Sequence, residues 1–213
     1  MAGIRTTAIL SSDKSHYVVN GAKKWITNGL WADYVTAAVR TGGHGMGGIS
    51  VLIIPLKNTP GIIRRRIYNS GLYASGSTYI GFTDVKVPVG NLIGKENKGF
   101  KIIMANFNPE RLTLAVGSLR LAQTCFEEAW NHALHRKTFG KSLMENQIIR
   151  AKFAAMARTN ESCHAWIEQI VFQMQNQKNA AHDPHTAARL ALVKVHAGKV
   201  LFILIIICGD TQP

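Results

Sequence analysis

Few residue patterns in this sequence have the spacing of a metal or phosphate site. Two histidine pairs, His132 with His135 and His182 with His185, are three residues apart, as neighbours on one face of a helix would be. No set of carboxylates or thiolates accompanies either pair, so we expect no metal site. Gly140-Lys141-Ser142 resembles the end of a phosphate-binding loop, but His135 stands where its first glycine should be and no strand precedes it. We therefore reject a nucleotide-binding loop.

The composition is that of a folded protein rather than a disordered one. The chain has 213 residues, of which 46% are hydrophobic and 17% charged, and this length suits one or two domains. The three cysteines are far apart and odd in number: Cys125, Cys163 and Cys208. They form no disulfide or zinc pattern, so we expect a reducing intracellular compartment. The sequence leaves open whether this is the mitochondrial matrix, the peroxisome or the cytoplasm.

The net charge of +13 favours an anionic ligand, such as a phosphorylated cofactor. Its tightest cluster is Arg64-Arg65-Arg66, in sequence typical of a strand. Alternate side chains of a strand point to opposite faces, so the triplet predicts no flat basic patch, and we expect no nucleic-acid binding. The apolar run Val200–Cys208 has nine residues, too few to cross a bilayer, and we expect no membrane span.

The first half of the chain is typical of short strands joined by tight turns. His16 to Val19 and Ala22 to Thr27 flank Asn20-Gly21, which predicts a hairpin with a type I′ turn. A second pair, Asn28-Gly29, closes the following strand, and the glycine-rich segment Thr41–Gly48 predicts a flexible hairpin loop. Further β-rich runs follow in order: Tyr34 to Val39, Ile49 to Ile54, Thr78 to Phe82 and Val85 to Val87. Such a series predicts an antiparallel barrel or sandwich.

From about Gly99 the apolar residues recur with helical spacing. Asn108-Pro109 predicts the start or a kink of a helix that runs to about His135. Ser142 to Glu145 is a capping box that predicts the opening of a second helix, with Ile149, Phe153 and Met156 on one face. A third helix is expected from about Asp183-Pro184, with Leu190, Val193 and Ala197 on one face. The order predicts an α+β chain, with a β-domain followed by an antiparallel helical bundle.

Asn20-Gly-Ala-Lys-Lys-Trp-Ile-Thr-Asn-Gly29, followed by Ala32-Asp33, resembles the middle-domain signature of acyl-CoA dehydrogenases. The resemblance extends in order over roughly residues 2 to 199, through Ser75 to Ser77, Phe82 to Pro88, Asn91 to Gly94, Asn106 to Arg111, and Arg136 to Lys141 with Gln147. Several motifs in one order are more specific than any one alone. The resemblance implies a middle β-domain at residues 1–94 and a helical C-terminal domain at residues 95–213, both incomplete.

The resemblance implies FAD-dependent α,β-dehydrogenation of an acyl-CoA thioester. In that reaction a base removes the α-proton while the β-hydrogen leaves as a hydride to flavin N5. Trp25 and Thr27 are two apart on an expected strand and should share a face, with the indole against the flavin ring and the hydroxyl near N5. Ile26 between them is included among the FAD contacts.

Four further residues match FAD contacts in the helical domain of the family. Arg136, with Thr138 and Phe139, matches residues that hold FAD across a subunit interface, where a guanidinium suits a pyrophosphate. Gln147, expected one turn into the capped helix, matches another contact. The resemblance therefore implies a homo-oligomer, a dimer or tetramer in the full-length form.

Glu110 matches the catalytic base of the isovaleryl-type and long-chain-type members of the family. In other members the base lies farther downstream, beyond Pro213, so the assignment is conditional; Glu110 could instead be a first-turn partner of a helix dipole. Phe107, Asn108 and Arg111 match residues that line the acyl-CoA pocket. Ser75 and Ser77 are assigned to that pocket as well, with plain turn residues as the alternative.

The sequence departs from the family at both ends. At the N-terminal end, Ala2-Gly3-Ile4 matches the residues just after the turn that follows the family's first FAD segment. At the C-terminal end, Leu201–Cys208 is apolar without an amphipathic pattern. We therefore expect a truncated or mis-spliced fragment with weak FAD binding and little turnover. Reducing equivalents would pass to an electron-transfer flavoprotein or another acceptor. The alternatives are an acyl-CoA oxidase or flavin monooxygenase on the same scaffold, and a non-catalytic remnant that only dimerises or binds acyl-CoA.

Overall fold

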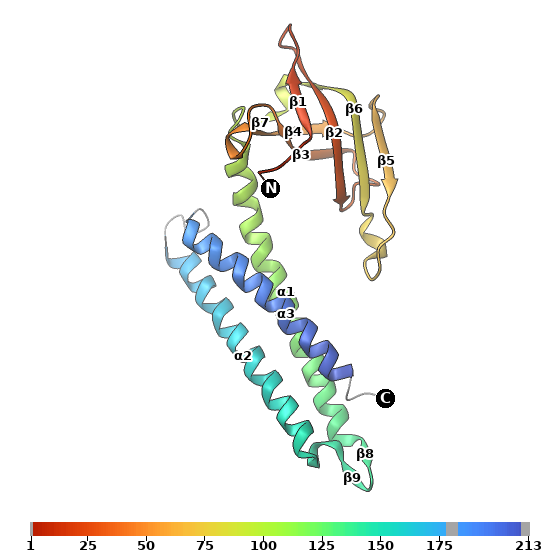
Figure 1. Cartoon of the computed structure of the whole chain (residues 1–213), viewed down its shortest axis with the longest axis vertical. Helices are drawn as coiled ribbons and strands as arrows, with labels where there is room; N and C mark the ends of the chain where they lie inside the picture. Colours follow the sequence, from red (N-terminus) through yellow and green to blue (C-terminus); the bar gives the residue numbers. More distant parts are fainter. Residues whose placement is uncertain (1, 178–182, 210–213) are drawn as a thin grey trace. The chain divides into compact units, whose positions relative to one another are not determined.

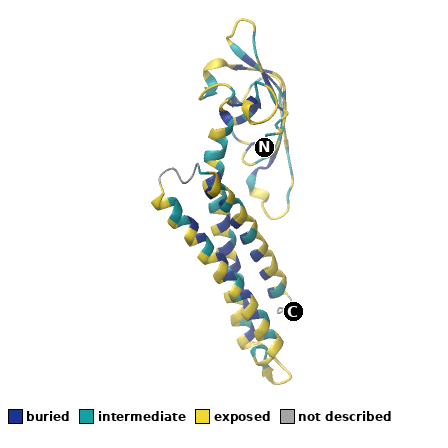
Figure 2. Ribbon diagram, turned by 60° about the vertical axis from the view of Figure 1, so that its left-hand side comes forward, coloured by how far each residue is buried: buried dark blue, intermediate teal, exposed yellow. Residues whose placement is uncertain are grey.

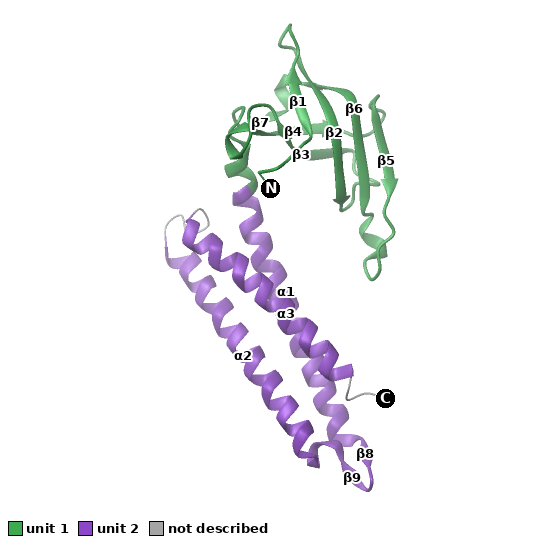
Figure 3. Cartoon of the chain, viewed as in Figure 1, with its two compact units in different colours: residues 1–103 green, residues 104–213 purple. Residues whose placement is uncertain are grey.

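The computed structural model of the chain describes residues 2–177 and 183–209. The chain divides into two compact units, Met1–Ile103 and Met104–Pro213 (Figure 3). Each unit has its own apolar core, one inside the sheet and one between the helices. A β-unit followed by a helical unit confirms the predicted α+β order. The boundary at residues 94/95 that the motifs predict lies directly after the last strand, and the boundary between the compact units lies inside the first helix.

Unit 1 is built on one seven-stranded sheet with the order β5-β6-β2-β1-β3-β4-β7 (Figure 1). All neighbouring strands are antiparallel except β1 and β3, which are parallel at Thr7 and Arg40. The strands are β1 Thr7–Leu10, β2 His16–Ile26, β3 Tyr34–Arg40, β4 Ile49–Pro55, β5 Ile62–Arg66, β6 Thr78–Pro88 and β7 Leu92–Ile93. Its core consists of apolar residues on one face of these strands, among them Tyr17, Val19, Val39, Leu52 and Ile80.

The predicted hairpin at Asn20-Gly21 is wrong. β2 continues through both residues and pairs along its length with β6, with a register shift between Val19 and Gly21 that marks a β-bulge. Gly21 has a φ of +130°, and a Cβ there would lie 2.8 Å from the Cα of Thr6. Asn20 fixes the bulge from the side, because its amide group both accepts from the backbone N–H of Asp84 and donates to the Asp84 carboxylate, each at 2.9 Å.

The end of β2 is also irregular. A second register shift lies between Lys23 and Ile26, and Trp25 between them has a φ of +62°. The strand ends at Ile26, so Thr27 lies beyond it and the regular alternation expected across Trp25 and Thr27 is absent. The turn predicted at Asn28-Gly29 is confirmed, with the Gly29 N–H donating to the Ile26 carbonyl oxygen at 3.2 Å.

The glycine-rich segment Thr41–Gly48 joins β3 and β4, which pair in register from Tyr34 with Pro55 to Arg40 with Ile49. It is therefore a hairpin loop, as predicted. The Arg40 guanidinium donates to the carbonyl oxygens of Gly43 and Gly45 in this loop, and to those of Ala2 and Ile4 in the N-terminal segment at 2.6 and 2.9 Å. The arginine therefore ties the loop to the N-terminal segment.

The helical unit contains long antiparallel helices whose buried residues face one another (Figure 2). The first helix, α1, runs without interruption through Asn108-Pro109, so the start predicted there is wrong, whereas its predicted end at His135 is confirmed. The short β8–β9 hairpin then leads to α2. The elements are α1 Gly99–His135, β8 Lys137–Thr138, β9 Lys141–Ser142, α2 Gln147–Asn176 and α3 Pro184–Gly209.

The predicted capping box is present but opens a shorter element than expected. The Ser142 backbone N–H donates to the Glu145 carboxylate at 3.0 Å, and the box begins a 3₁₀ turn, Leu143–Glu145. The cap of α2 is Asn146, whose side chain accepts from the Ile148 N–H at 2.9 Å. Gln147 is therefore the first residue of α2 rather than a residue one turn inside a helix. The predicted face of Phe153 and Met156 is buried.

The predicted start of α3 and its core face are confirmed. Leu190, Val193 and Ala197 are fully buried. The helix does not stop at the apolar run but continues to Gly209, with Val200, Leu204 and Cys208 buried at intervals of four residues. The run predicted to lack a pattern therefore has one buried side. By length and composition alone, α3 is long and apolar enough to cross a membrane. The nine-residue apolar run did not indicate this. One such helix is weak evidence of a span.

Candidate functional site

The predicted site residues of unit 1 come together at one corner, here called the β2 corner, which consists of Trp25, Ile26, Thr27, Ser75 and Ser77. The link is a backbone hydrogen bond in which the N–H of Asn28 donates to the carbonyl oxygen of Ser75 at 2.8 Å. Ile26 pairs with Thr78 in the adjoining strand. The sequence separates these segments widely, and the β2–β6 pairing brings them side by side.

The β2 corner presents an aromatic face beside hydroxyl groups. The Trp25 side chain is 58% exposed and therefore lies outside the core of unit 1. Thr27 is exposed as well. The hydroxyl oxygens of Ser75 and Ser77 are 3.0 Å apart, and the Asn69 amide donates to Ser77 at 3.3 Å. This arrangement can take a flat ring against the indole and hydrogen-bond the polar groups of a ligand at its edge.

Arg64 was not predicted as part of this corner, yet it positions the segment after Thr27. Its Nη1 atom lies within hydrogen-bond distance of the carbonyl oxygens of Gly29, Leu30 and Ala32, at 3.4, 3.2 and 3.1 Å. The guanidinium of Arg65 instead lies over the Tyr79 ring, 4.8 Å from its centroid. The prediction that the triplet forms no flat basic patch is therefore confirmed. The only sequence signal for Arg64 was its place in a basic triplet that follows the apolar pair Ile62-Ile63 of a strand.

A second group lies on α1 in the helical unit and contains Phe107, Asn108, Glu110 and Arg111. Asn108 is 3% exposed, and its side-chain oxygen accepts from Arg111 Nη1 at 3.0 Å. Glu110 is exposed, and its Oε1 atom accepts from Asn106 Nδ2 at 2.7 Å. Glu110 lies well inside α1, so the alternative of a first-turn partner of a helix dipole is wrong. Asn106, which holds the carboxylate, was part of the quoted motif but was not singled out.

The third group surrounds the β8–β9 hairpin and contains Arg136, Thr138, Phe139 and Gln147. Phe139 is at the tip with a φ of +51° and is fully exposed, and the other three residues are exposed as well. From Glu110 to the end of α1 at His135 the helix rises about 38 Å, at 1.5 Å per residue. The second and third groups are therefore far apart along α1 within one chain, and one flavin cannot contact both.

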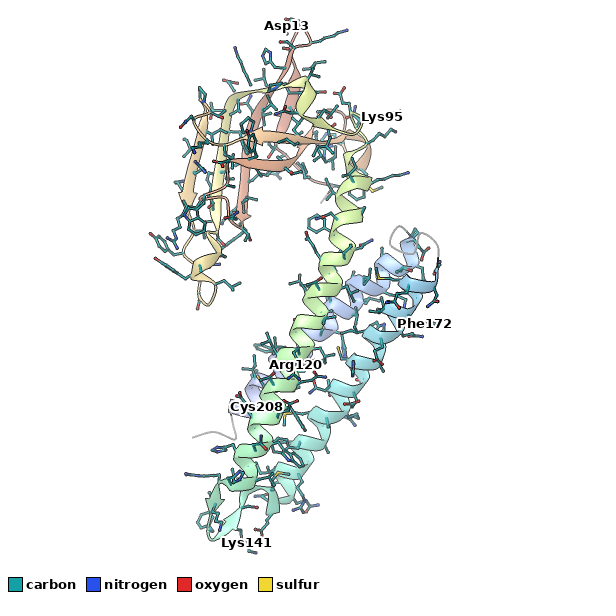
Figure 4. All side chains as sticks on the ribbon, turned by 180° about the vertical axis from the view of Figure 1, so that it is seen from behind. Asp13, Lys95, Arg120, Lys141, Phe172 and Cys208 are labelled. Carbon is teal, nitrogen blue, oxygen red and sulfur yellow. The ribbon has the colours of Figure 1, made fainter. Side chains whose placement is uncertain are left out.

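Of the two histidine pairs, only His132 with His135 lies wholly within the described residues. His135 Nδ1 lies 2.7 Å from the Asn131 carbonyl oxygen, and His182 lies outside the described residues. Within residues 2–177 and 183–209, no group of three or more histidine, cysteine or acidic side chains could hold a metal ion. A groove of about 540 Å³ does lie between α1 and α2, with Arg120 and Phe172 on its two sides (Figure 4). None of the predicted site residues lines it.

Comparison with known proteins agrees with this division. The sequence model described as "Acyl-CoA dehydrogenase, middle domain" matches residues 1–85, and that described as "Acyl-CoA dehydrogenase, C-terminal domain" matches residues 97–208. The acyl-CoA dehydrogenase apdG of Emericella nidulans is 47% identical over 201 residues, which are 94% of this chain and 46% of the relative. An acyl-CoA dehydrogenase of Bacillus subtilis is 42% identical over 161 residues, or 75% of this chain and 42% of the relative.

Solved structures lead to the same family. The crystal structure of an acyl-CoA dehydrogenase complexed with FAD from Bacillus anthracis superimposes with a TM-score of 0.80 at 26% identity, over 99% of this chain and 38% of that chain. This chain spans a little under half the length of the curated relatives it matches. The match of both domain models in order, together with the identity to apdG, shows that the chain belongs to the acyl-CoA dehydrogenase family.

Proposed function

We propose that this chain provides flavin and acyl-CoA contacts for FAD-dependent α,β-dehydrogenation of an acyl-CoA thioester. The observation that carries the proposal is the β2 corner, where the Asn28–Ser75 hydrogen bond joins the segment assigned to the flavin to the segment assigned to the thioester. This bond holds two segments with complementary roles next to each other, directly after β2 and before β6.

The residues of the chain suit FAD. The exposed Trp25 indole offers a flat apolar surface, and the exposed Thr27 offers a hydroxyl for a ring nitrogen. The exposed guanidinium of Arg136 suits a pyrophosphate, with Thr138, Phe139 and Gln147 beside it. Bound FAD would supply the hydride acceptor. The protein's part is to orient the ring at Trp25 and to exclude water from its face.

Glu110 is proposed as the base that takes the α-proton. Its Oε1 atom is held by the Asn106 amide, which restricts the rotamer and leaves the carboxylate able to accept a proton. The hydrogen-bonded pair of buried Asn108 and half-buried Arg111 flanks Glu110 in the same turn of the helix and would position the thioester. The chain length and branching of the acyl group are not part of this proposal.

A second copy of the chain is proposed to complete the flavin site. Glu110 and the β8–β9 hairpin are about 38 Å apart along α1. One bound flavin cannot reach both, so each flavin would contact Glu110 of one subunit and the β8–β9 hairpin of another. This geometry favours a homo-oligomer. We further propose an electron-transfer flavoprotein or a similar protein as the electron acceptor, and an intracellular, reducing compartment, consistent with the three cysteines being thiols.

The test is a comparison of Glu110→Gln with Glu128→Gln, an exposed glutamate on the same helix. The full chain is saturated with FAD, mixed with acyl-CoA thioesters without oxygen, and followed by the visible absorbance of the flavin. We expect weak FAD binding and slow bleaching, lost in Glu110→Gln while thioester binding persists, and unchanged in Glu128→Gln. No bleaching with any thioester, with binding retained, identifies a non-catalytic remnant instead. Rapid oxygen consumption by the reduced flavin identifies an oxidase or monooxygenase.

A further inference from the structure

Two of the three cysteines lie side by side, one in α1 and one in the last turn of α3. The thiol of Cys208 donates to the carbonyl oxygen of Cys125, with 3.5 Å between sulfur and oxygen. Figure 4 labels Cys208 at the end of α3, next to α1. Cys208 belongs to the core of the helical unit, and the half-buried Cys125 packs against that core. The packing of α3 on α1 therefore brings together two free thiols that are 83 residues apart in the sequence.

Covalent geometry and electrostatics both place the two thiols within reach of each other. A carbonyl oxygen is about 2.4 Å from the Cα atom of its own residue, so the Cys208 sulfur lies within about 6 Å of the Cys125 Cα atom. Burial raises the pKa of the Cys208 thiol, and a negative charge on Cys125 raises it as well. One charge acts on another group in this way mainly within about 4–6 Å. The two side chains therefore share one small space between the helices.

The end of α3 can supply the movement that a bond between these sulfurs needs. The sulfur atoms of a disulfide are about 2.05 Å apart. Helix α3 ends at Gly209, one residue after Cys208. The last four carbonyl groups of a helix have no partner within that helix, and helix ends fray. Cys125 is instead in the interior of α1. A rotation of the Cys208 side chain, with a small shift of the last turn of α3, can therefore close the gap while α1 stays in place.

We propose that Cys125 and Cys208 form a reversible disulfide that fastens the end of α3 to α1 when the chain meets a disulfide oxidant such as oxidised glutathione. The thiolate of half-buried Cys125 attacks one sulfur of glutathione disulfide, forms a mixed disulfide and releases one glutathione thiolate. The thiolate of Cys208 then attacks the Cys125 sulfur, forms the bond between the two cysteines and releases the second glutathione thiolate. Two protein thiols lose two electrons and two protons, and both pass to the glutathione disulfide, which becomes two glutathione molecules.

The disulfide would make the packing of α3 depend on the redox state of the surroundings. In a reducing compartment the pair stays as thiols, and a disulfide forms there transiently when the level of oxidant rises. The bond would hold the end of α3 where Leu204 and Cys208 already pack in the core. This modification goes beyond the proposed dehydrogenation and does not rest on it.

Cys163 is the internal reference for this pair. It is fully buried on α2, and burial raises the pKa of its thiol. In the sequence it lies between the other two cysteines, so loop closure in the unfolded chain favours pairs that include Cys163 over the pair of Cys125 and Cys208. A predominance of the Cys125–Cys208 disulfide in the native chain would therefore come from the fold.

The experiment treats the full chain with oxidised glutathione, once under native conditions and once in concentrated urea. Remaining thiols are blocked with iodoacetamide, and the tryptic peptides are mapped by mass spectrometry without reduction. Trypsin places the three cysteines on separate peptides, residues 121–136, 159–178 and 200–213. We expect the native chain to link 121–136 with 200–213 inside one molecule, reversibly on addition of dithiothreitol. In urea, links that include 159–178 should prevail.

Variants assign the link and its effect on stability. Cys125→Ala and Cys208→Ala should each abolish the native link, whereas Cys163→Ala, the matched control, should keep it. Closing a loop of 83 residues constrains the unfolded chain, so oxidation should raise the melting temperature of Cys163→Ala by about 5–10 °C. Oxidation should leave the melting temperature of Cys208→Ala unchanged. Far-UV circular dichroism of the reduced proteins checks that they are folded, and the unaltered chain replaces Cys163→Ala if that variant does not fold.

Three results would overturn the proposal. The first is a native chain in which Cys163 is linked as often as Cys125 is linked to Cys208. The second is a link that only joins two molecules, seen as dimers on non-reducing gels whose yield grows with protein concentration. The third is a native chain in which Cys125 carries glutathione, or does not react at all, and no bond to Cys208 forms. That result would mean that the end of α3 does not bring the second thiol within reach.

Discussion

The backbone N–H of Asn28 donates to the carbonyl oxygen of Ser75 at 2.8 Å, and this bond ties the turn after β2 to the loop before β6. Arg64 supports the same turn through three carbonyl oxygens. The residues assigned to flavin and thioester in unit 1 therefore depend on a small number of backbone contacts. A change that displaces either loop should impair both kinds of binding together.

Gly76→Ala should displace this corner. Gly76 has a φ of +58°, and a Cβ there would lie 2.3 Å from the ring of Trp31. We expect a loss of about 1–3 kcal/mol in the free energy of unfolding of the β-unit, together with weaker acyl-CoA binding. Gly90→Ala is the control, because a Cβ at Gly90 meets no atom within 4 Å. Urea unfolding followed by tryptophan fluorescence measures the first effect, and an unchanged midpoint in Gly76→Ala would contradict it.

Lys23 should make the stability of unit 1 depend on pH. Burial lowers the pKa of Lys23 to about 8 in the folded protein, from an ordinary value of 10.5. Between these two values the unfolded chain binds more protons than the folded chain, so this residue makes the free energy of unfolding rise as the pH rises from about 8 to about 10.5. Lys23→Met should abolish that rise, whereas Lys24→Met at an exposed position should keep it. Urea midpoints at about pH 7 and about pH 10 measure the difference.

The helical continuation beyond Val200 can be tested through its core. Leu204 is fully buried, so Leu204→Ala should lower the free energy of unfolding of the helical unit by about 2–5 kcal/mol. Leu192→Ala, at a side chain that is 60% exposed, should change it by no more than about 0.5 kcal/mol. Thermal unfolding followed by far-UV circular dichroism reports the helices. Equal midpoints for the two variants would mean that the tail does not pack in solution.

The three thiols should differ in reactivity. Burial raises the pKa of the Cys163 thiol, and burial together with the nearby Cys125 raises that of Cys208. Since the thiolate is the nucleophile, both should be alkylated more slowly than the partly exposed Cys125. Timed iodoacetamide labelling of the native chain, read by peptide mass spectrometry, gives the order. Labelling of Cys163 as fast as Cys125 would mean that the helical core opens readily.

The periodic parts of the fold could be predicted from the sequence, whereas the places where long-range pairing competes with local preference could not. Leu190, Val193 and Ala197 recur with helical spacing, and they are buried as this spacing predicts. Asn20-Gly21 has the composition of a tight turn, yet β6 and β1 pair with the strand on both sides of it and keep it extended. Turn preference is weaker than two ladders of hydrogen bonds.

The candidate site was predictable as a set of residues but not as an arrangement. The family motif singled out Trp25 and Thr27, and the assumed regular strand would have placed them on one face. The actual geometry depends on a positive φ at Trp25 and on the end of the strand at Ile26, which no spacing rule contains. The support from Arg64 and Asn106 was missed for a related reason, because both act through contacts with backbone or side chains that only the folded chain brings within reach.

The bulge at Asn20 and Gly21 sets the alternation of side chains between the two faces of the sheet along β2. The extra residue that it accommodates decides which side of the sheet the next side chains face, as far as Lys23, where the second register shift begins. Exchanging one side chain for another at an exposed position such as Ala22 or Lys24 leaves this alternation unchanged. Deleting Ala22 would turn the Lys23 side chain to the opposite face of the sheet, away from the Ala38 carbonyl oxygen to which it donates. This stretch of the gene should therefore tolerate many point mutations and no change in length.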